Sequence, residues 1–312
     1  MISVVVPVYQ AEQTLPALVE RLTRALAALT PSYEIILVDD RSEDGSWRVI
    51  LDLLPAHPAI VAVRLSRNFG QHYAITAGLD LARGRWTVLM DCDLQDQPEH
   101  IGLLLARAQE GFDVVHARRL ARQDTLGKRV MSAAFYRIFT LLSGYRLDHT
   151  VGAFRIMDRK VVDAYRQMRE AHRLFGGMIE WLGFSTAFVD VQHAARQGGR
   201  TSYRFRSAMQ VALDGVISFS NRPLYLSVFI GALMAVLSGA WVLVILVYFA
   251  LHRTGVQGWP SLMAATTFIG GLILFNLGVI GLYLGRIYDQ VKQRPLYVID
   301  RVVASGRGGP AA

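Results

Sequence analysis

Residues 86–96 read WTVLMDCDLQD, an apolar run that ends in three aspartates and a glutamine. A short apolar run of this kind is typical of a buried strand. Carboxylates repel one another at close range, so a cluster of them at a strand end calls for a positive partner. The chain has 312 residues and a formal net charge of +8, yet three acids fall within these six residues, 91–96.

Three other runs in the first 120 residues resemble strands, and a segment with helical periodicity follows each of the four. The predicted strands are 2–9, 34–40, 60–66 and 86–93, and the predicted helices are 12–29, 44–54, 71–82 and 98–110. Their alternation predicts an α/β fold with a mostly parallel sheet and helices on both faces. Ser42 and Asp44 are candidate helix N-caps, and Pro98 suits a first helical turn.

A second acidic pair, Asp39 and Asp40, ends another predicted strand. Ligands of parallel sheets bind beyond the carboxyl ends of the strands, so we expect both acidic groups to share one crevice. Alternate residues of an extended segment face the same side, which would point Asp91, Asp93 and Gln95 together. Hard oxygen ligands favour Mg²⁺ or Mn²⁺, and Mg²⁺ usually bridges carboxylates to substrate phosphates. The pattern predicts a metal site for a diphosphate.

Other nucleotide and metal chemistries lack their motifs. The chain has neither G-x-G-x-x-G after the first predicted strand nor a G-x-x-x-x-G-K-[ST] loop. Cys92 is the only cysteine, which excludes an intrachain disulfide and a thiolate metal site. The basic residues gather near apolar segments rather than along one soluble helix, so no nucleic-acid partner is expected.

Two segments predict membrane spans. No charged residue occurs in 223–251 or in 254–285, and each exceeds the roughly 20 apolar residues that cross a bilayer. Basic residues flank the outer ends and the connecting loop holds one arginine, so both termini are expected in the cytoplasm. Segment 204–220 has one apolar face and a basic start, which predicts an interfacial helix, with an ordinary core helix as the alternative. We expect domains at 1–200, 201–222, 223–286 and 287–312.

Several segments together resemble a known family. VVVPVYQAEQTL (4–15), ILVDDRSEDGS (36–46), LSRNFGQHYAITAG (65–78) and LMDCDLQDQPE (89–99) resemble the family-2 glycosyltransferases of GT-A fold. R-x-x-G-x-T-S-Y (196–203) and the hairpin ending LGRIYDQVKQRPLYVI (284–299) are similar to polyprenyl-phosphate glycosyltransferases. These include dolichyl-phosphate mannose synthases and undecaprenyl-phosphate enzymes, among them the transferase for formylated aminoarabinose.

The resemblance implies roles for individual residues. The nucleotide would lie among Pro7, Tyr9, Glu12, Asp39, Asp40 and Asp91, and the metal would bind Asp91, Asp93 and Gln95. Catalytic roles would fall to Asp93, Asp148 and Arg155. Phosphate or acceptor contacts would come from Arg118, Lys128, Arg129, Arg200, Tyr203 and Arg204.

The chain departs from the family pattern at Ala153, where many relatives carry an aspartate before Phe-Arg. Asp148 could substitute for it, or could be a turn residue. Relatives also often have Ser-Lys-Tyr where this chain has 201–203, which would move the basic role to Arg200. A lipid phosphate is already anionic at neutral pH, so it can attack without a strong general base.

The expected function is inverting transfer of a sugar from a nucleotide-diphosphate donor, of the UDP-sugar class, to undecaprenyl phosphate. The expected place is the cytoplasmic face of a bacterial inner membrane, in cell-envelope or lipopolysaccharide modification, by a homo-oligomer. A processive polysaccharide synthase shares the domain, but the only Arg-Trp pair, Arg85-Trp86, lacks the glutamine of Q-x-x-R-W. A catalytically silent nucleotide-binding scaffold is the other alternative, because of Ala153.

Overall fold

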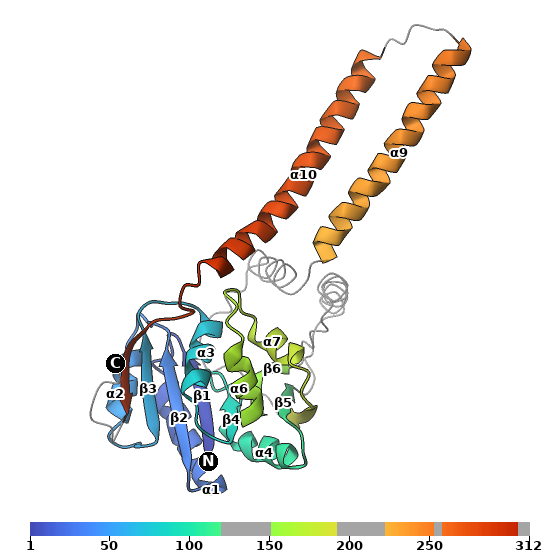
Figure 1. The fold of residues 1–312 in the computed structure, drawn as a ribbon. Helices are drawn as coiled ribbons and strands as arrows, with labels where there is room; N and C mark the ends of the chain where they lie inside the picture. Colours follow the sequence, from blue (N-terminus) through green and yellow to red (C-terminus); the bar gives the residue numbers. More distant parts are fainter. Residues whose placement is uncertain (120–150, 192–221, 253–257, 305–312) are drawn as a thin grey trace. The chain divides into compact units, whose positions relative to one another are not determined.

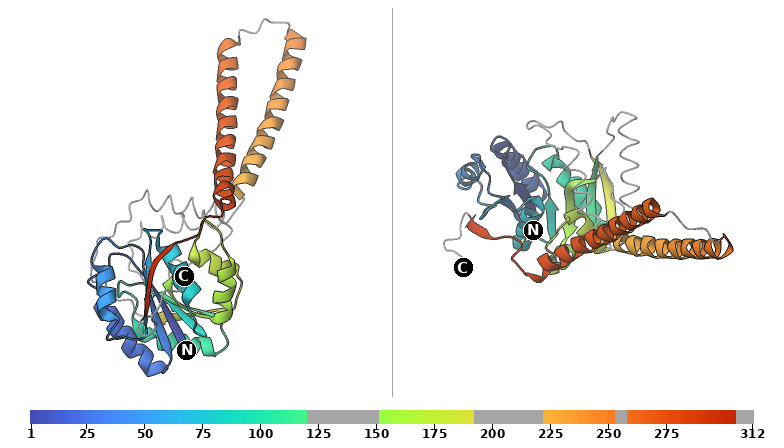
Figure 2. Two further views of the ribbon diagram at one scale, coloured as in Figure 1. Left: turned by 60° about the vertical axis from the view of Figure 1, so that its left-hand side comes forward. Right: turned by 90° about the horizontal axis from the view of Figure 1, so that it is seen from above.

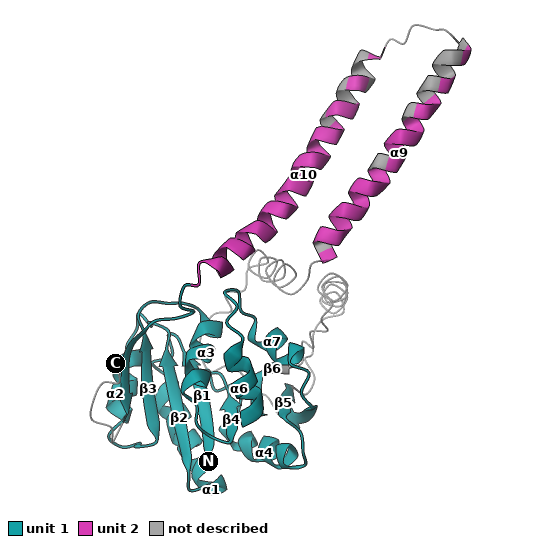
Figure 3. Ribbon diagram, viewed as in Figure 1, with its two compact units in different colours: residues 1–130, 147–203, 294–312 teal, residues 131–146, 204–293 magenta. Residues whose placement is uncertain are grey.

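The computed structural model of the chain describes residues 1–119, 151–191, 222–252 and 258–304. These residues divide into two compact units (Figure 3). Residues 1–119, 151–191 and 294–304 belong to the first unit, and residues 222–252 and 258–293 belong to the second. Predicted site residues Lys128, Arg129, Asp148, Arg200, Tyr203 and Arg204 lie outside the described residues, as does the predicted interfacial helix 204–220.

The first unit is built on an eight-stranded sheet with strand order β7-β5-β6-β4-β1-β2-β3-β8 (Figure 1). The strands are β1 (Ile2–Val8), β2 (Tyr33–Asp39), β3 (Ile60–Leu65), β4 (Trp86–Leu89), β5 (Val114–Arg119), β6 (Val151–Asp158), β7 (Thr186–Val191) and β8 (Ile299–Ala304). Strands β1 to β4 are parallel, while β6 and β8 run antiparallel to their neighbours. The predicted α/β fold with a mostly parallel sheet is therefore confirmed.

Helices cover both faces of this sheet, as the sequence predicts (Figures 1 and 2). The helices are α1 (Leu15–Leu29), α2 (Ser46–Leu53), α3 (Gln71–Leu81), α4 (Ile101–Gln109), α6 (Arg159–Gln167) and α7 (Phe175–Trp181), with a short 3-10 turn at Pro98–His100. The largest apolar core joins α1, α2 and α4 to one face of the sheet. Helix α3 packs on the opposite face, beside α6.

Two local predictions are wrong. Strand β4 ends at Leu89 rather than at residue 93, and the acidic segment after it turns, with Leu94 at a φ of 61°. The alternation argument for Asp91, Asp93 and Gln95 therefore does not apply. Gly45, not Ser42 or Asp44, occupies the N-cap position of α2.

The sequence analysis predicted none of β5, β6, β7, α6, α7 and β8, and strand β8 is the last of these along the chain. It follows the apolar helices and lies in the segment predicted as a C-terminal tail, yet it pairs antiparallel with β3. Its pattern is mixed, IDRVVA, and four of its six residues are exposed. An exposed edge strand lacks the apolar run by which the four buried strands were found, so its sequence carries little signal. The four domain boundaries stay a prediction.

The second unit consists of α9 (Arg222–His252) and α10 (Trp259–Val291), which run beside each other. Segments Leu224–Trp241 and Phe268–Val291 are long and apolar enough to cross a membrane, judged by length and composition. Almost none of their side chains are buried, unlike those of a core helix in a soluble protein. The two helical spans therefore agree with the sequence analysis.

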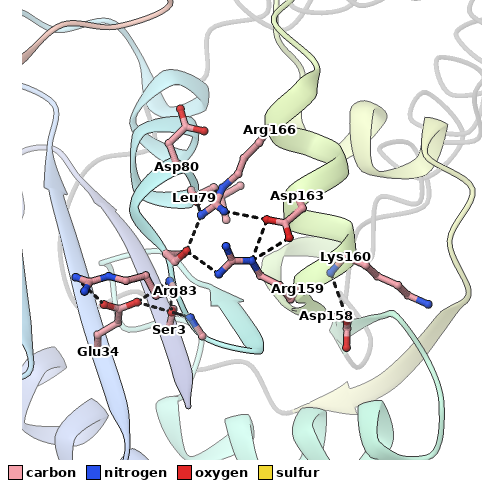
Figure 4. A network of polar contacts seen from close by, with 12 residues as sticks. Ser3, Glu34, Leu79, Asp80, Arg83, Asp158, Arg159, Lys160, Asp163 and Arg166 are labelled. Carbon is pink, nitrogen blue, oxygen red and sulfur yellow. Dashed lines mark hydrogen bonds and ion pairs between the residues drawn. The ribbon is translucent and has the colours of Figure 1, made fainter.

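Helix α3 is held at its carboxyl end by charged side chains (Figure 4). Arg166 of α6 donates hydrogen bonds to the backbone oxygens of Leu79 and Ala82, and Asp163 accepts from Arg166 and Arg159. Cations at a helix carboxyl terminus satisfy its last carbonyls and oppose the helix dipole. These contacts join the carboxyl end of α3 to α6.

Gly78 lets α3 approach the sheet closely. A Cβ atom at this position would lie 2.3 Å from Cγ1 of Val5 and 3.2 Å from Cγ2 of Val38. Gly78→Ala should lower the free energy of unfolding by about 1–3 kcal/mol, the usual cost of overpacking. Urea unfolding of the purified protein in detergent, followed by tryptophan fluorescence, measures the change. Gly176→Ala in α7 is the matched control, since nothing lies within 4 Å of its Cβ position. Equal stability of both variants would contradict this account.

Candidate active site

A cavity of about 390 Å³ opens where the carboxyl ends of β1, β2 and β4 meet. The strand order reverses here, because β2 and β3 lie on one side of β1 and β4 on the other. Open α/β sheets bind ligands at such a switch point. The lining residues are Pro7, Val8, Tyr9, Asp40, Asn68, Gly70, Gln71, Ala74, Asp91, Cys92 and Asp93.

The structure brings together the two acidic groups that the sequence placed in one crevice. Asp40, Asp91 and Asp93 line the cavity, with Pro7 and Tyr9 of the first strand end. Tyr9 is 43% exposed, so its ring is accessible to a ligand. The shared crevice predicted for these two strand ends is therefore present, although Asp39 is not part of it.

Five predicted site residues within the described part of the chain do not line the cavity: Arg118 and Arg155, which are described below, and the three nucleotide or metal candidates Asp39, Glu12 and Gln95. Asp39 is fully buried; it accepts a hydrogen bond from the backbone N–H of Ser42 and lies 3.2 Å from Nε of Arg64. Glu12 accepts from the backbone N–H of Gly45 at 3.0 Å. Gln95 donates its backbone N–H to Oδ1 of Asp93 at 3.1 Å. Direct ligand contacts by these three residues stay a prediction.

Asp40 organises the loop that follows β3. Its two carboxylate oxygens accept the backbone N–H groups of Phe69 and Gly70, each at 2.7 Å. Burial raises the pKa of Asp40 above its usual range, and the two amides partly oppose that rise. This carboxylate thus fixes the backbone beside Asn68 and Gly70, both of which line the cavity.

The backbone is strained where the strands enter this cavity. Of the four described non-glycine residues with a left-handed φ, three follow these strands: Gln10 (51°), Arg41 (58°) and Leu94 (61°). They come shortly after β1, β2 and β4, the three strands whose ends form the site. Such conformations cost free energy and persist where the surroundings enforce them, commonly at functional sites. Tight turns at all three strand ends therefore shape the cavity.

Two of the predicted metal ligands, Asp91 and Asp93, belong to this cavity. Asp91 and Asp93 line the same cavity, and Nε2 of Gln71 donates to Oδ1 of Asp91 at 2.8 Å. Among the described residues, no group of three or more His, Cys, Asp or Glu side chains could hold a metal alone. Because Mg²⁺ is usually held by one or two carboxylates plus phosphates, a metal at Asp91 and Asp93 would need a substrate to complete its coordination, and the metal site stays a prediction.

Cys92 separates these two carboxylates but is not a candidate nucleophile. Burial raises the pKa of its thiol to about 11, so the reactive thiolate is scarce at neutral pH. Its backbone oxygen accepts a hydrogen bond from the hydroxyl of Thr14 at 2.7 Å. The residue therefore contributes its backbone to the anchoring of the acidic turn.

Arg155 provides a buried positive charge near the acids. It lies on β6 in register with Leu89, is 5% exposed, and donates to the backbone oxygens of Ala153 and Gly152. Its guanidinium lies 5.0 Å from the ring centre of Phe175. Burial lowers the pKa of Arg155 to about 10, while the charges of Glu180 and Asp91 oppose this. It thus stays a cation at neutral pH.

Arg118, a predicted acceptor contact, is engaged elsewhere in the first unit. It lies on β5, and Nε and Nη2 form a two-pronged pair with Asp190 of β7 at 2.6 and 3.1 Å. Its role at an acceptor stays a prediction.

Sequence reasoning did not assign roles to Asn68 and Gln71, which line the cavity. Both residues lie in the segment RNFGQH (67–72), which was quoted above only for its resemblance to the family.

Comparison with known proteins agrees with this geometry. The model of "Glycosyl transferase family 2" matches residues 3–166. The "Uncharacterized glycosyltransferase sll0501" of Synechocystis is 38% identical over 300 residues, covering 96% of this chain and 94% of the relative. The SfII prophage-derived bactoprenol glucosyl transferase of Shigella flexneri is 36% identical over 314 residues, covering 99% of both chains.

A solved structure supports the fold. Mannosyl-3-phosphoglycerate synthase from Rubrobacter xylanophilus superposes with a TM-score of 0.51 at 20% identity, covering 70% of this chain and 72% of that one. At this identity the likeness shows the fold alone. The family model spans more than half of the chain, and its residues include the strand ends that form the cavity. The chain belongs to the family-2 glycosyltransferases, and its first unit has their GT-A fold.

Proposed function

We propose that this glycosyltransferase moves a sugar from a nucleotide-diphosphate donor, of the UDP-sugar class, to a polyprenyl phosphate. The observation that carries the donor half is the cavity at the switch point of the sheet, with Asp91 and Asp93 on its wall. A diphosphate needs positive charge, and paired carboxylates recruit it as a divalent cation. The exposed ring of Tyr9 on the same wall suits stacking on a base.

The acceptor half rests on the second unit and on the relatives. Helices α9 and α10 are apolar enough to cross a membrane, which suits an acceptor that is itself a membrane lipid. The Shigella relative, named for transfer of glucose to bactoprenol, matches over the whole chain and not only over the catalytic domain. UDP-glucose is accordingly the first donor to test. The cytoplasmic face of a bacterial inner membrane, cytoplasmic termini and a homo-oligomer belong to the same proposal.

The proposed role of each site residue follows from its chemistry. Asp91 and Asp93, with Gln95 beside them, would hold Mg²⁺ or Mn²⁺. That cation, when bound, neutralises the diphosphate and makes it a better leaving group. Asp40 acts through the loop that it fixes, and Arg155 supplies a permanent charge from β6. Catalysis would consist of positioning and charge neutralisation.

The reaction itself balances without a strong base. An oxygen of the lipid phosphate attacks the anomeric carbon and forms the new C–O bond, while the bond from that carbon to the donor's β-phosphate oxygen breaks. The electron pair leaves with the nucleoside diphosphate, and the configuration inverts. No proton must be removed from a phosphate that is already anionic, so an alanine at position 153 is compatible with activity.

A transfer assay tests the proposal directly. The purified protein in detergent, with undecaprenyl phosphate, MgCl₂ or MnCl₂ and a panel of nucleotide sugars, should yield a chloroform-soluble sugar-lipid and one nucleotide per transferred sugar. Product should disappear with EDTA and return with the metal. Nucleotide release without glycolipid would reject this acceptor. Absence of both, with folded protein that binds UDP, would favour the silent scaffold instead.

Asp93→Asn tests the acidic turn. The change keeps the size of the side chain but removes a metal-binding charge, so kcat should fall by about 100-fold or more. Asp52→Asn is the matched control, because Asp52 forms an exposed pair with Arg48 on α2. The control should retain wild-type turnover. Full activity of Asp93→Asn in the same assay would remove this residue from the site.

Arg155→Lys tests whether a charge alone is sufficient. Lysine keeps the charge but loses the planar fork and its contact with the ring of Phe175, so kcat should fall about 10- to 100-fold. Arg24→Lys, in an exposed pair with Glu20, controls for the substitution. Steady-state kinetics varying donor and lipid separately give the measurement. An unchanged kcat would mean that Arg155 is a structural residue of β6.

A further inference from the structure

We infer that the C-terminal segment 297–300 positions the donor-binding loops, with Tyr297, Val298 and Asp300 as positioning residues of the glycosyl transfer. The inference rests on the proposed function, because it takes the cavity at the strand ends as the donor site. None of the three residues lines that cavity. Each of them instead contacts a different element that carries lining residues.

Val298 holds the loop after β3. Its backbone oxygen accepts the N–H of Ser66 at 2.9 Å, and β8 then continues from Ile299, in register with Leu65. Ser66 begins the loop whose Phe69 and Gly70 donate to Asp40. The attachment therefore fixes the start of this loop to a paired strand, while Asp40 fixes its end.

Asp300 holds the turn after β2. Its Oδ2 accepts from Nη1 of Arg41 at 3.0 Å. Arg41 directly follows Asp40 and has a left-handed φ of 58°, a conformation that its surroundings must enforce. An exposed ion pair contributes little stability by itself. Its value here is geometric, because it restrains the residue next to the carboxylate that organises the site.

Tyr297 holds α3. Its hydroxyl donates to Oδ2 of Asp80 at 2.6 Å, and Arg169 pairs with the same carboxylate at 2.7 Å. Burial and the neighbouring Asp80 raise the pKa of Tyr297, so the hydroxyl keeps its proton and remains a donor. Helix α3 carries Gln71, which lines the cavity and binds Asp91.

The three attachments reach three elements that supply lining residues to the cavity. They join the turn after β2, the loop after β3 and helix α3, which provide Asp40, Gly70 and Gln71 to the cavity. A segment that served only to cover the edge of β3 would require the ladder of β8 alone. The Asp300 contact lies at the start of β8, at the end of the strand pair nearest the loop after β3, while the Tyr297 contact lies just before β8 and reaches the carboxyl end of α3.

The double substitution Tyr297→Phe with Asp300→Asn tests this in the full-length protein. It removes the hydroxyl that donates to Asp80 and the negative charge that pairs with Arg41, but leaves the β8 ladder and all lining residues intact. Tyr33→Phe with Asp52→Asn is the matched control. Tyr33 begins β2, at the opposite end of the strand from Asp40, and its hydroxyl has no partner within the described part of the chain. Asp52 lies in an exposed pair on α2.

Hydrogen–deuterium exchange measures the loops without any ligand. In the double variant, amides of 66–70 and 40–45 should exchange about five-fold faster or more, while those of β1 keep their protection. In the transfer assay, KM for the nucleotide sugar should rise about five- to ten-fold, with KM for undecaprenyl phosphate and kcat within two-fold. Combining Tyr297→Phe with Asp300→Glu instead of Asp300→Asn keeps the negative charge at position 300. This variant should show a smaller rise in KM for the nucleotide sugar.

Unchanged exchange in these loops would overturn the inference, whether or not the protein proves to be a glycosyltransferase of this class. Faster exchange with an unchanged donor KM would also overturn it, because the segment would then stabilise the loops without positioning the donor. Isothermal titration of the wild-type protein with UDP and MnCl₂ separates the two ideas. Absence of UDP binding there would count against the proposed function, while the exchange result would still decide whether this segment restrains the loops.

Discussion

The hydrogen bonds from Phe69 and Gly70 to the carboxylate of Asp40 are the interaction on which the site depends. They join the end of β2 to the loop after β3, and this loop leads directly into α3. A buried carboxylate is costly unless it is hydrogen-bonded, so the bonds from the two loop amides stabilise the loop in this conformation. Helix α3 begins at Gln71, whose side chain donates to Asp91 just after β4, so this loop is also linked to the end of β4. Three strand ends thereby form one cavity rather than three separate turns.

The sequence predicted the parts of the fold that carry strong periodicity. Buried parallel strands such as ISVVVPV have no polar face, and their ends were found within a residue or two, except where acids followed Leu89. The side chains of the acidic segment could not reveal its turn, because its shape depends on a left-handed Leu94, which composition does not predict. Strand β8 was not predicted from the sequence for a related reason. It pairs with residues more than 230 positions earlier, and no local pattern reports such a partner.

The sequence predicted which kinds of residue meet at the candidate site, but not which side chains each of them contacts. Two acidic strand ends in a parallel sheet had to meet at one edge, and Asp40, Asp91 and Asp93 do line one cavity. Asp39 carries the same charge beside Asp40 but points to Ser42 and Arg64, since successive side chains of a strand face opposite sides. Gln71 lies at the start of α3 and donates to Asp91, and the close approach of this helix to the sheet requires the glycine at position 78. Contacts of this kind come from packing, not from spacing along the chain.

Charge explains why the site combines acids with buried arginine. A diphosphate donor and a lipid phosphate are both anions, and two unit charges 4 Å apart repel by about 4 kcal/mol at an effective dielectric constant near 20. Three carboxylates on the cavity wall would increase that repulsion if they acted alone. They become useful when Asp91 and Asp93 hold a divalent cation, whose two positive charges would offset their two negative charges and give the diphosphate a direct positive contact. Arg155 adds a charge that burial cannot easily remove, and its hydrogen bonds to Ala153 and Gly152 use neutral carbonyls rather than carboxylates. Its positive charge is therefore less compensated than that of Arg118, which is paired with Asp190. This difference makes Arg155 the better candidate to face a phosphate.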